Sequence, residues 1–365
     1  MFDHAETMAR EDRVSRCQNL EKHLIQTLRH VLSGAGHNEP GSGGDVRFNG
    51  ELSHMKLSVV IPTYNYGRFL HHCLESVAGQ MADDTEIIVV DDGSTDDTSH
   101  RLQSLSGLLP AGRLRHFYQQ NAGPAAARNH GVRQARGDFI WFLDADDCLN
   151  EGALDCMRQA IMAHPQADLI FAGYRSVGEK GRIVEHPAGS LAVNRTRNLK
   201  NYLLQRLPGL TIGSAVIRKA VLQGIVFPEG VHSNEDVVFF GHLLATCRAV
   251  SVPGQVVDKV RHPNSLRNDL ARIEESGLQA VERLFDPEFL DVQQMRLRSL
   301  YLGCYCMNLF RTYYLQGYTA KARGFYRQAL GAYPLLIFNW GYASKFLRSL
   351  FGIHKRGLKL KNIQR

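Results

Sequence analysis

The stretch Phe139–Asp147 constrains the fold more than any other part of the sequence, because five apolar residues lead directly into a segment with three carboxylates. A short apolar run of this kind is typical of a strand that is buried on both faces of a sheet. Ligands of open α/β sheets bind at the carboxyl ends of the strands, where Asp144, Asp146 and Asp147 stand here. Because clustered carboxylates repel one another, the stretch predicts a site for a hard divalent cation, Mg²⁺ or Mn²⁺, with a phosphate on its far side. The alternative is a polar turn in which Asn150 caps the next helix.

The composition is that of an ordinary globular protein, with 365 residues of which 44% are hydrophobic and 22% charged. This length allows one large or two medium-sized domains. The seven cysteines have no Cys-x-x-Cys or zinc-like spacing, which predicts free thiols in a reducing compartment. No apolar stretch approaches the roughly 18–20 residues of a membrane span. The N-terminus lacks the apolar segment of a signal peptide, so we expect a cytoplasmic protein.

The positive charge is concentrated at the C-terminal end. The net charge is +7, yet the residues after Asp291 include 13 Lys and Arg and no Asp or Glu. Such asymmetry predicts an anionic partner, and nucleic acid is disfavoured because no recognition motif accompanies the charge. A predicted amphipathic helix over Leu335–Phe351 beside these cations suits an anionic membrane surface, at the inner face of the cell membrane. A packed terminal helix with a solvated basic end is the alternative.

The order of the predicted elements indicates three regions. Residues 1–54 predict a helical extension and a Gly-rich linker, with Met55 as a possible start of the functional chain and an accessory helical segment as the alternative. Strands and helices alternate from Leu57 onward, which predicts βαβ units and a mostly parallel sheet over residues 55–270. Residues 271–365 predict a helical, basic C-terminal region.

Polar residues also follow the other predicted strands of this sheet. Pro62, Thr63, Tyr64 and Asn65 end the strand Leu57–Ile61. Asp91 and Asp92 follow the strand Glu86–Val90. Arg128 lies in a predicted helix that begins at Gly123-Pro124. We expect these groups to converge with the carboxylates of Phe139–Asp147 at one edge of the sheet.

In order and spacing, these motifs resemble the nucleotide-sugar half of a family 2 glycosyltransferase with the GT-A fold, over roughly Leu57–Leu266. The resemblance implies a Rossmann-like, mostly parallel sheet flanked by helices. It implies an inverting, metal-dependent transfer from a nucleotide-diphosphate sugar, most often a UDP-sugar, to a hydroxyl group. The acceptor would be a glycan or lipid-linked molecule in surface polysaccharide biosynthesis, and the sugar a hexose or N-acetylhexosamine.

The resemblance also assigns roles on the donor side. Tyr64 would stack on the base within the loop Pro62–Asn65, and Asp92 would accept a hydrogen bond from the base with support from Asp91. Arg128 would contact the donor. Three of these residues also have an ordinary structural explanation. Tyr64 would be a capping aromatic residue, Asp92 a charge at a helix start and Arg128 a surface residue of a helix.

The same resemblance assigns the metal and the chemistry. Asp144-Ala145-Asp146 matches the Asp-x-Asp motif, in which Asp146 would bind the metal and Asp144 the metal and the ribose or sugar. Asp236 would be the catalytic base, with Glu235 on the acceptor side, although adjacent acids are also common at helix starts.

His262 would be a further ligand of the metal or would contact the diphosphate. It lies in a segment that resembles the family's Tyr-Arg-x-His-x-x-Ser pattern. The match is imperfect, because Lys259 and Val260 replace the usual Tyr and Arg.

Two other functions remain as alternatives. A sugar nucleotidyltransferase would need a Gly-rich, basic loop after the first strand, where this chain has Pro-Thr-Tyr-Asn. A catalytically silent nucleotide-sugar-binding or scaffold subunit would not need Asp144, Asp146 and Asp236 together.

Overall fold

The computed structural model describes residues 55–106, 112–178, 181–231, 234–260 and 270–350. The predicted extension 1–54 and the predicted ligand His262 lie outside these residues. Nine strands of the described residues form one sheet, in which β7 pairs with β6 beside the order β3-β2-β1-β4-β8-β6-β9-β5. Their bounds are Leu57–Thr63 (β1), Thr85–Asp91 (β2), Leu114–Tyr118 (β3), Phe139–Phe142 (β4), Cys148–Leu149 (β5), Leu169–Val177 (β6), Ile183–His186 (β7), Ala215–Arg218 (β8) and Ala249–Val260 (β9).

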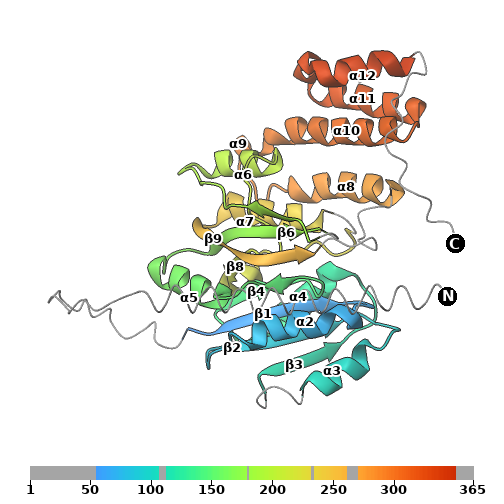
Figure 1. Ribbon diagram of the computed structural model, residues 1–365. Coiled ribbons are helices and arrows are strands. Elements are labelled where there is room, and N and C mark those ends of the chain that lie inside the picture. Colours follow the sequence, from blue (N-terminus) through green and yellow to red (C-terminus); the bar gives the residue numbers. More distant parts are fainter. Residues whose placement is uncertain (1–54, 107–111, 179–180, 232–233, 261–269, 351–365) are drawn as a thin grey trace, which may run out of the picture. The chain divides into compact units, whose positions relative to one another are not determined.

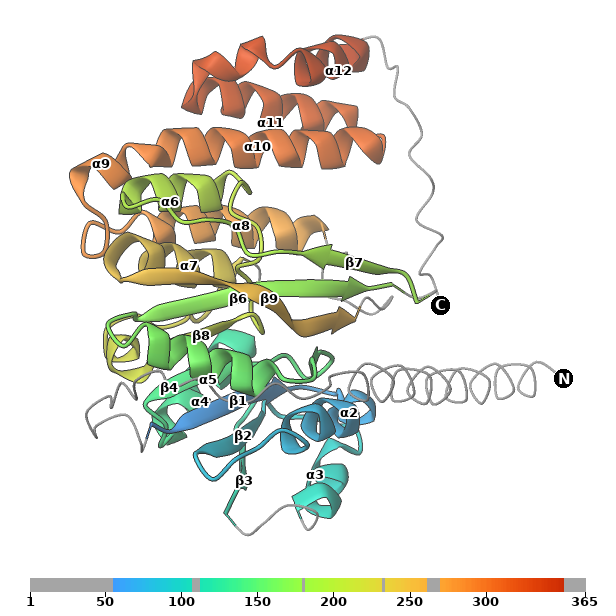
Figure 2. The ribbon, with the colours of Figure 1, turned by 60° about the vertical axis from the view of Figure 1, so that its left-hand side comes forward.

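The first half of the sheet is parallel and the second half is mixed. Strands β3, β2, β1 and β4 run parallel to one another, as the alternation of strands and helices predicts. Strand β8 then joins β4 in the antiparallel direction, whereas β6 and β9 are parallel neighbours that lie side by side in Figure 2. The end of β4 therefore lies where the parallel half meets the mixed half.

Helices cover both faces of the sheet, which explains the nearly continuous apolar sequence of its strands. One face packs against three helices, α2 (Gly67–Ala78), α3 (Thr98–Ser106) and α5 (Ala153–Ala163), and the other against α4 (Pro124–Gln134) and α7 (Glu235–Thr246). In β4, Trp141 belongs to the first core and its neighbour Phe142 to the second. The predicted buried strand and the α/β fold class are thus confirmed.

The remaining helices lie beyond the sheet. They are α6 (Arg195–Leu203), η1 (Lys219–Gln223), α8 (Leu270–Leu284), α9 (Val292–Met295), α10 (Leu297–Leu315), α11 (Thr319–Ala332), η3 (Pro334–Phe338) and α12 (Trp340–Leu350). Helices α10, α11 and α12 follow one another in space beyond α8 (Figure 1). Among the described helices, none combines the length and apolar character that a transmembrane span requires.

Two predictions about helix ends are wrong. The last helix does not begin at Leu335, because Pro334 favours an extended residue before it and opens a separate 3₁₀ turn, so that α12 begins at Trp340. Asn150 is not an N-cap, since α5 begins at Ala153 after a left-handed Gly152. Pairing of β5 with β9 instead holds Asn150, whose side-chain amide donates to the carbonyl of Gln255 at 2.9 Å.

Candidate active site

Three carboxylates gather just beyond β4. Asp144, Asp146 and Asp147 each have an oxygen within 4.8 Å of the others, and Asp147 is buried. The cluster lies at the carboxyl end of β4, next to the parallel strand β1. Carboxylate oxygens are the ligands that Mg²⁺ and Mn²⁺ prefer, and the spacing lets them share one ion. The residues therefore fit the predicted divalent cation in kind and in arrangement.

Two cationic side chains offset part of the charge of this cluster. The Nη2 atom of Arg128 lies 2.8 Å from Oδ1 of Asp144, and the Nζ atom of Lys259 lies 2.9 Å from Oδ2 of Asp147 and 3.6 Å from Oδ2 of Asp144. Burial disfavours the charged form of Asp144, but Arg128 and Lys259 outweigh it and lower its pKa. Burial raises the pKa of Asp147 to about 7, against the opposing effect of Lys259.

Arg128 also reaches the second pair of acids. Its Nη1 atom lies 3.1 Å from Oε1 of Glu235, so one buried guanidinium joins the cluster after β4 to the start of α7. The adjacent Asp236 accepts a hydrogen bond from the backbone N–H of Val237 at 2.9 Å. Burial, together with the charge of Glu235, raises the pKa of Asp236 to about 6, against the effect of Arg128. A carboxylate with this pKa is suited to accept a proton near neutral pH.

The loop after β1 is tied to the loop after β2. Asn65 has a left-handed backbone with φ 56°, and its Oδ1 atom accepts hydrogen bonds from the N–H groups of Thr95 and Asp96 at 2.7 and 3.2 Å. Pro62 and Thr63 belong to β1 and are buried, whereas the Tyr64 side chain is 45% exposed and is thus available to a flat ligand. This places an exposed aromatic ring beside a hydrogen-bonded loop.

Asp91 and Asp92 are buried at the end of β2 and hold the neighbouring loops. Asp91 accepts a hydrogen bond from the N–H of Ser94 at 2.9 Å. Asp92 accepts three, from the side chain of Gln119 and from the N–H groups of Ala122 and Gly123, at 2.7 to 2.9 Å. Asp92 thereby shapes the loop that leads into α4, the helix that carries Arg128.

Two residues that connect the site were not predicted from the sequence. Lys259 stands where the resembling family usually has Tyr, but its ion pairs with carboxylates more than a hundred positions earlier leave no local pattern. Asn129 exchanges hydrogen bonds with the backbone of Phe227 and also donates to Glu229 at 3.0 Å, which fixes the turn before α7. Its position directly after Arg128 is the one signal that the sequence offers.

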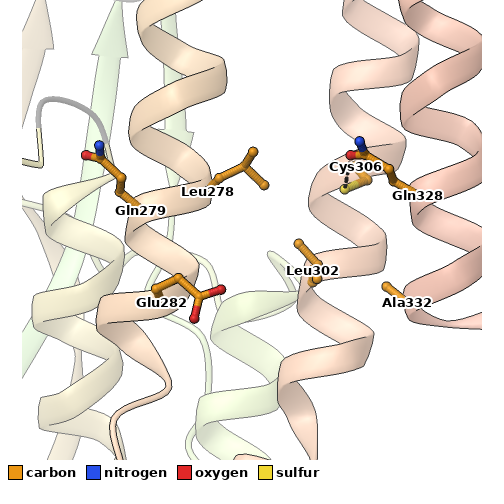
Figure 3. Close-up of a pocket in the computed structure, with 7 residues that line it drawn as sticks. All are labelled: Leu278, Gln279, Glu282, Leu302, Cys306, Gln328 and Ala332. Carbon is orange, nitrogen blue, oxygen red and sulfur yellow. Dashed lines mark hydrogen bonds between the residues drawn. The ribbon is translucent and has the colours of Figure 1, made fainter.

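A cavity of about 560 Å³ lies elsewhere, between α8, α10 and α11. In Figure 3, Leu278 from α8 and Leu302 from α10 point toward it. Its lining contains none of the predicted site residues and is completed by Gln279, Glu282, Cys306, Gln328 and Ala332. The candidate active site is therefore the polar edge of the sheet and not this cavity.

The comparisons with known proteins agree with this geometry. Residues 58–226 match the family model described as Glycosyl transferase family 2. The GalNAc(5)-diNAcBac-PP-undecaprenol beta-1,3-glucosyltransferase of Campylobacter jejuni is 33% identical over 187 residues, which are 50% of this chain and 58% of that protein. Three Rickettsia proteins described as uncharacterized glycosyltransferases are 31–32% identical over 51% of this chain. The matches span 26–29% of the length of those Rickettsia proteins.

Solved structures share the fold. S. aureus TarS 1-349 in complex with UDP-GlcNAc has a TM-score of 0.51 at 20% identity, covering 84% of this chain and 95% of that chain. The mannosyltransferase PcManGT from Pyrobaculum calidifontis, in complex with GDP-Man and Mn²⁺, has a TM-score of 0.50 at 16% identity, covering 82% of this chain and 86% of that chain. Through the domain that contains residues 58–226, the chain belongs to glycosyltransferase family 2 and has a GT-A-like fold.

Proposed function

We propose that this protein is an inverting, metal-dependent glycosyltransferase that moves a hexose or N-acetylhexosamine from a UDP-sugar to a hydroxyl group. The observation that carries the proposal is the Arg128 bridge, which ties the carboxylate cluster to the acids at the start of α7. One guanidinium thereby holds the carboxylate cluster to Glu235, the residue next to Asp236, whose pKa is raised. Such a pair of sites suits a reaction in which a diphosphate leaves while a hydroxyl loses its proton.

The donor would bind along the edge formed by β1, β2 and β4. Tyr64 would stack on the base and Asp92 would orient it, supported by Asp91 and the loop Pro62–Asn65. Asp146 and Asp144 would hold Mn²⁺ or Mg²⁺, with His262 as a further ligand. The bound cation would neutralise the charge that grows on the departing diphosphate.

Asp236 would act on the acceptor. Its carboxylate takes the proton of the acceptor hydroxyl while that oxygen forms a bond to the anomeric carbon. The bond from this carbon to the diphosphate oxygen breaks, and its electron pair leaves with the nucleoside diphosphate. Attack from the face opposite the diphosphate inverts the configuration, and Glu235 would help to orient the acceptor.

Two similar proteins support a class of donor and acceptor. The TarS structure contains UDP-GlcNAc, and the Campylobacter enzyme is named for an undecaprenol-linked acceptor. We therefore propose a UDP-sugar donor and a glycan or lipid-linked acceptor in surface polysaccharide biosynthesis, at the inner face of the cell membrane. Residues 55–270 would form the catalytic domain, and residues 271–365 a helical region that contacts the membrane.

A donor screen tests the proposed reaction. Release of nucleoside diphosphate is measured for a panel of nucleotide sugars with Mn²⁺, with and without undecaprenyl-diphosphate-linked saccharides. We expect turnover of one UDP-sugar, with an acceptor-dependent increase in rate. Binding of a UDP-sugar without turnover on any acceptor, or by hydrolysis, would favour the scaffold function.

The exposed apolar side chains of η3 and the start of α12 support the membrane contact. Leu335, Ile337, Phe338 and Trp340 are 51–81% exposed within six residues, in a region with many cations and no acids. Apolar side chains beside cations suit the interface of an anionic bilayer. We therefore expect the protein to float with vesicles that contain anionic phospholipid at low salt, and to release them at high salt.

Matched variants distinguish vesicle binding through η3 and the start of α12 from nonspecific adsorption to the vesicles. Replacing both Phe338 and Trp340 by Ser should weaken vesicle binding about tenfold or more, because two large apolar groups no longer enter the interface. Ile183→Ser, which removes an apolar side chain that is 52% exposed on β7, should leave binding unchanged. Equal flotation of the double variant and the native chain would favour the packed-helix alternative.

A further inference from the structure

Lys259 occupies an unusual place beside the carboxylate cluster. It lies near the end of β9, and its Nζ atom contacts Asp147 at 2.9 Å, Asp144 at 3.6 Å and the carbonyl of Ile212 at 3.0 Å. The Lys259 side chain is 17% exposed and that of Asp147 is 3% exposed. An ammonium group is thus built into the place where the predicted metal site needs positive charge.

Strand β9 holds both oxygens of Asp147. The Oδ2 atom pairs with Lys259, and the Oδ1 atom accepts a hydrogen bond from the backbone N–H of Val260 at 3.2 Å. These two contacts fix the position of the Asp147 carboxylate against β9. Asp144 and Asp146, the acids of the Asp-x-Asp motif, are the cluster's predicted donors toward a cation.

The charge of Lys259 also acts on that cation. When ionised, the three carboxylates carry a formal charge of −3, which the ammonium group of Lys259 and the guanidinium of Arg128 together reduce to −1. Repulsion between the ammonium group and the ion lowers the affinity for the ion. A less tightly bound ion can leave more readily with the product diphosphate.

We propose that Lys259 is a positioning residue that keeps Asp147 against β9 and weakens the cluster's affinity for a divalent cation. The proposal rests on the metal site of the proposed function. The proposal gives Lys259 a role that the usual Tyr at this position could not have, because a Tyr side chain would bring no positive charge. It also explains why a third acid, Asp147, directly follows the Asp-x-Asp motif.

Direct titration of Mn²⁺, followed by the electron paramagnetic resonance signal of the free ion without any donor, tests the proposal. Lys259→Met should bind Mn²⁺ on the order of tenfold more tightly than the native chain, because one nearby positive charge is lost. Lys259→Arg keeps the charge and should bind within about threefold of the native chain. Lys259→Met combined with Asp147→Asn removes both charges of the buried pair and should return the affinity toward the native value.

The combined variant guards against loss of the fold, because it leaves no unpaired charge in the buried site. Native Mn²⁺ affinity in a folded Lys259→Met would overturn the role of Lys259 and leave the metal site standing. Absence of Mn²⁺ binding from both the native chain and Lys259→Met would overturn the metal site and this proposal together. Neither result bears on Asp236, whose role is tested separately by turnover.

Discussion

Replacing Asp236 by Asn should lower kcat about 10³-fold while leaving the affinity for the UDP-sugar within about twofold of the native value. The amide has the shape of the carboxylate and can still accept the hydrogen bond from the N–H of Val237, so the start of α7 stays in place. It cannot take a proton from the acceptor hydroxyl. Release of nucleoside diphosphate gives the rate, and equilibrium binding of the donor gives the affinity. Asp155→Asn, the same change at a 74% exposed acid on α5, should retain full activity.

The pH dependence of kcat/KM provides a second test of Asp236 as the catalytic base. Because burial raises the pKa of Asp236 to about 6, its carboxylate is largely ionised at pH 7.5 and about a tenth ionised at pH 5. The base must be ionised to act, so kcat/KM should fall as the pH drops through about 6, at saturating Mn²⁺. The residual rate of Asp236→Asn should lack this fall. A rate that is constant between pH 5 and 8, or a variant with native kcat, would contradict the assignment.

Local patterns in the sequence predict the donor-binding half of the fold well. Strands β1, β2 and β4 are recognisable because helices cover both faces, and each strand therefore reads as an unbroken apolar run that ends in polar residues. The carboxylates after β4 lie close together because they are also neighbours in the chain. Glu235 and Asp236 were placed at the start of a helix correctly, since their charges favour that position.

Contacts between distant segments were harder to predict. The sequence around Arg128 predicts only that it lies in a helix. Its ion pair with Glu235 depends on how α4 and α7 pack on the same face of the sheet. Lys259 reads as an ordinary cation near the end of a strand, and its pair with Asp147 depends on how β9 lies beside the turn after β4. Such pairs are set by tertiary packing, so the sequence supplies the residue types but not the partners.

Asp146 and Asp147 are adjacent acids, yet their replacement should give different results. Asp146→Asn should abolish measurable Mn²⁺ binding and lower kcat about 10³-fold, because the predicted direct ligand is lost. Asp146 is half-buried, whereas the side chain of Asp147 is 3% exposed, so Asp146→Asn should lower the melting temperature less than Asp147→Asn does. Asp147→Asn leaves Lys259 without its closest partner and should cost about 3 kcal/mol in the free energy of unfolding.

Mn²⁺ titration, thermal unfolding and turnover, each measured on both variants, separate the two acids. Asp83→Asn, the same change at a fully exposed acid, is the matched control and should leave all three quantities unchanged. Loss of Mn²⁺ binding in Asp147→Asn with native binding in Asp146→Asn would exchange their roles, and would mean that Lys259 gives way to the ion when it binds. Because a metal ligand and a buried tether differ in which measurement they affect, loss of activity alone cannot distinguish them, and the pattern across the three measurements decides between them.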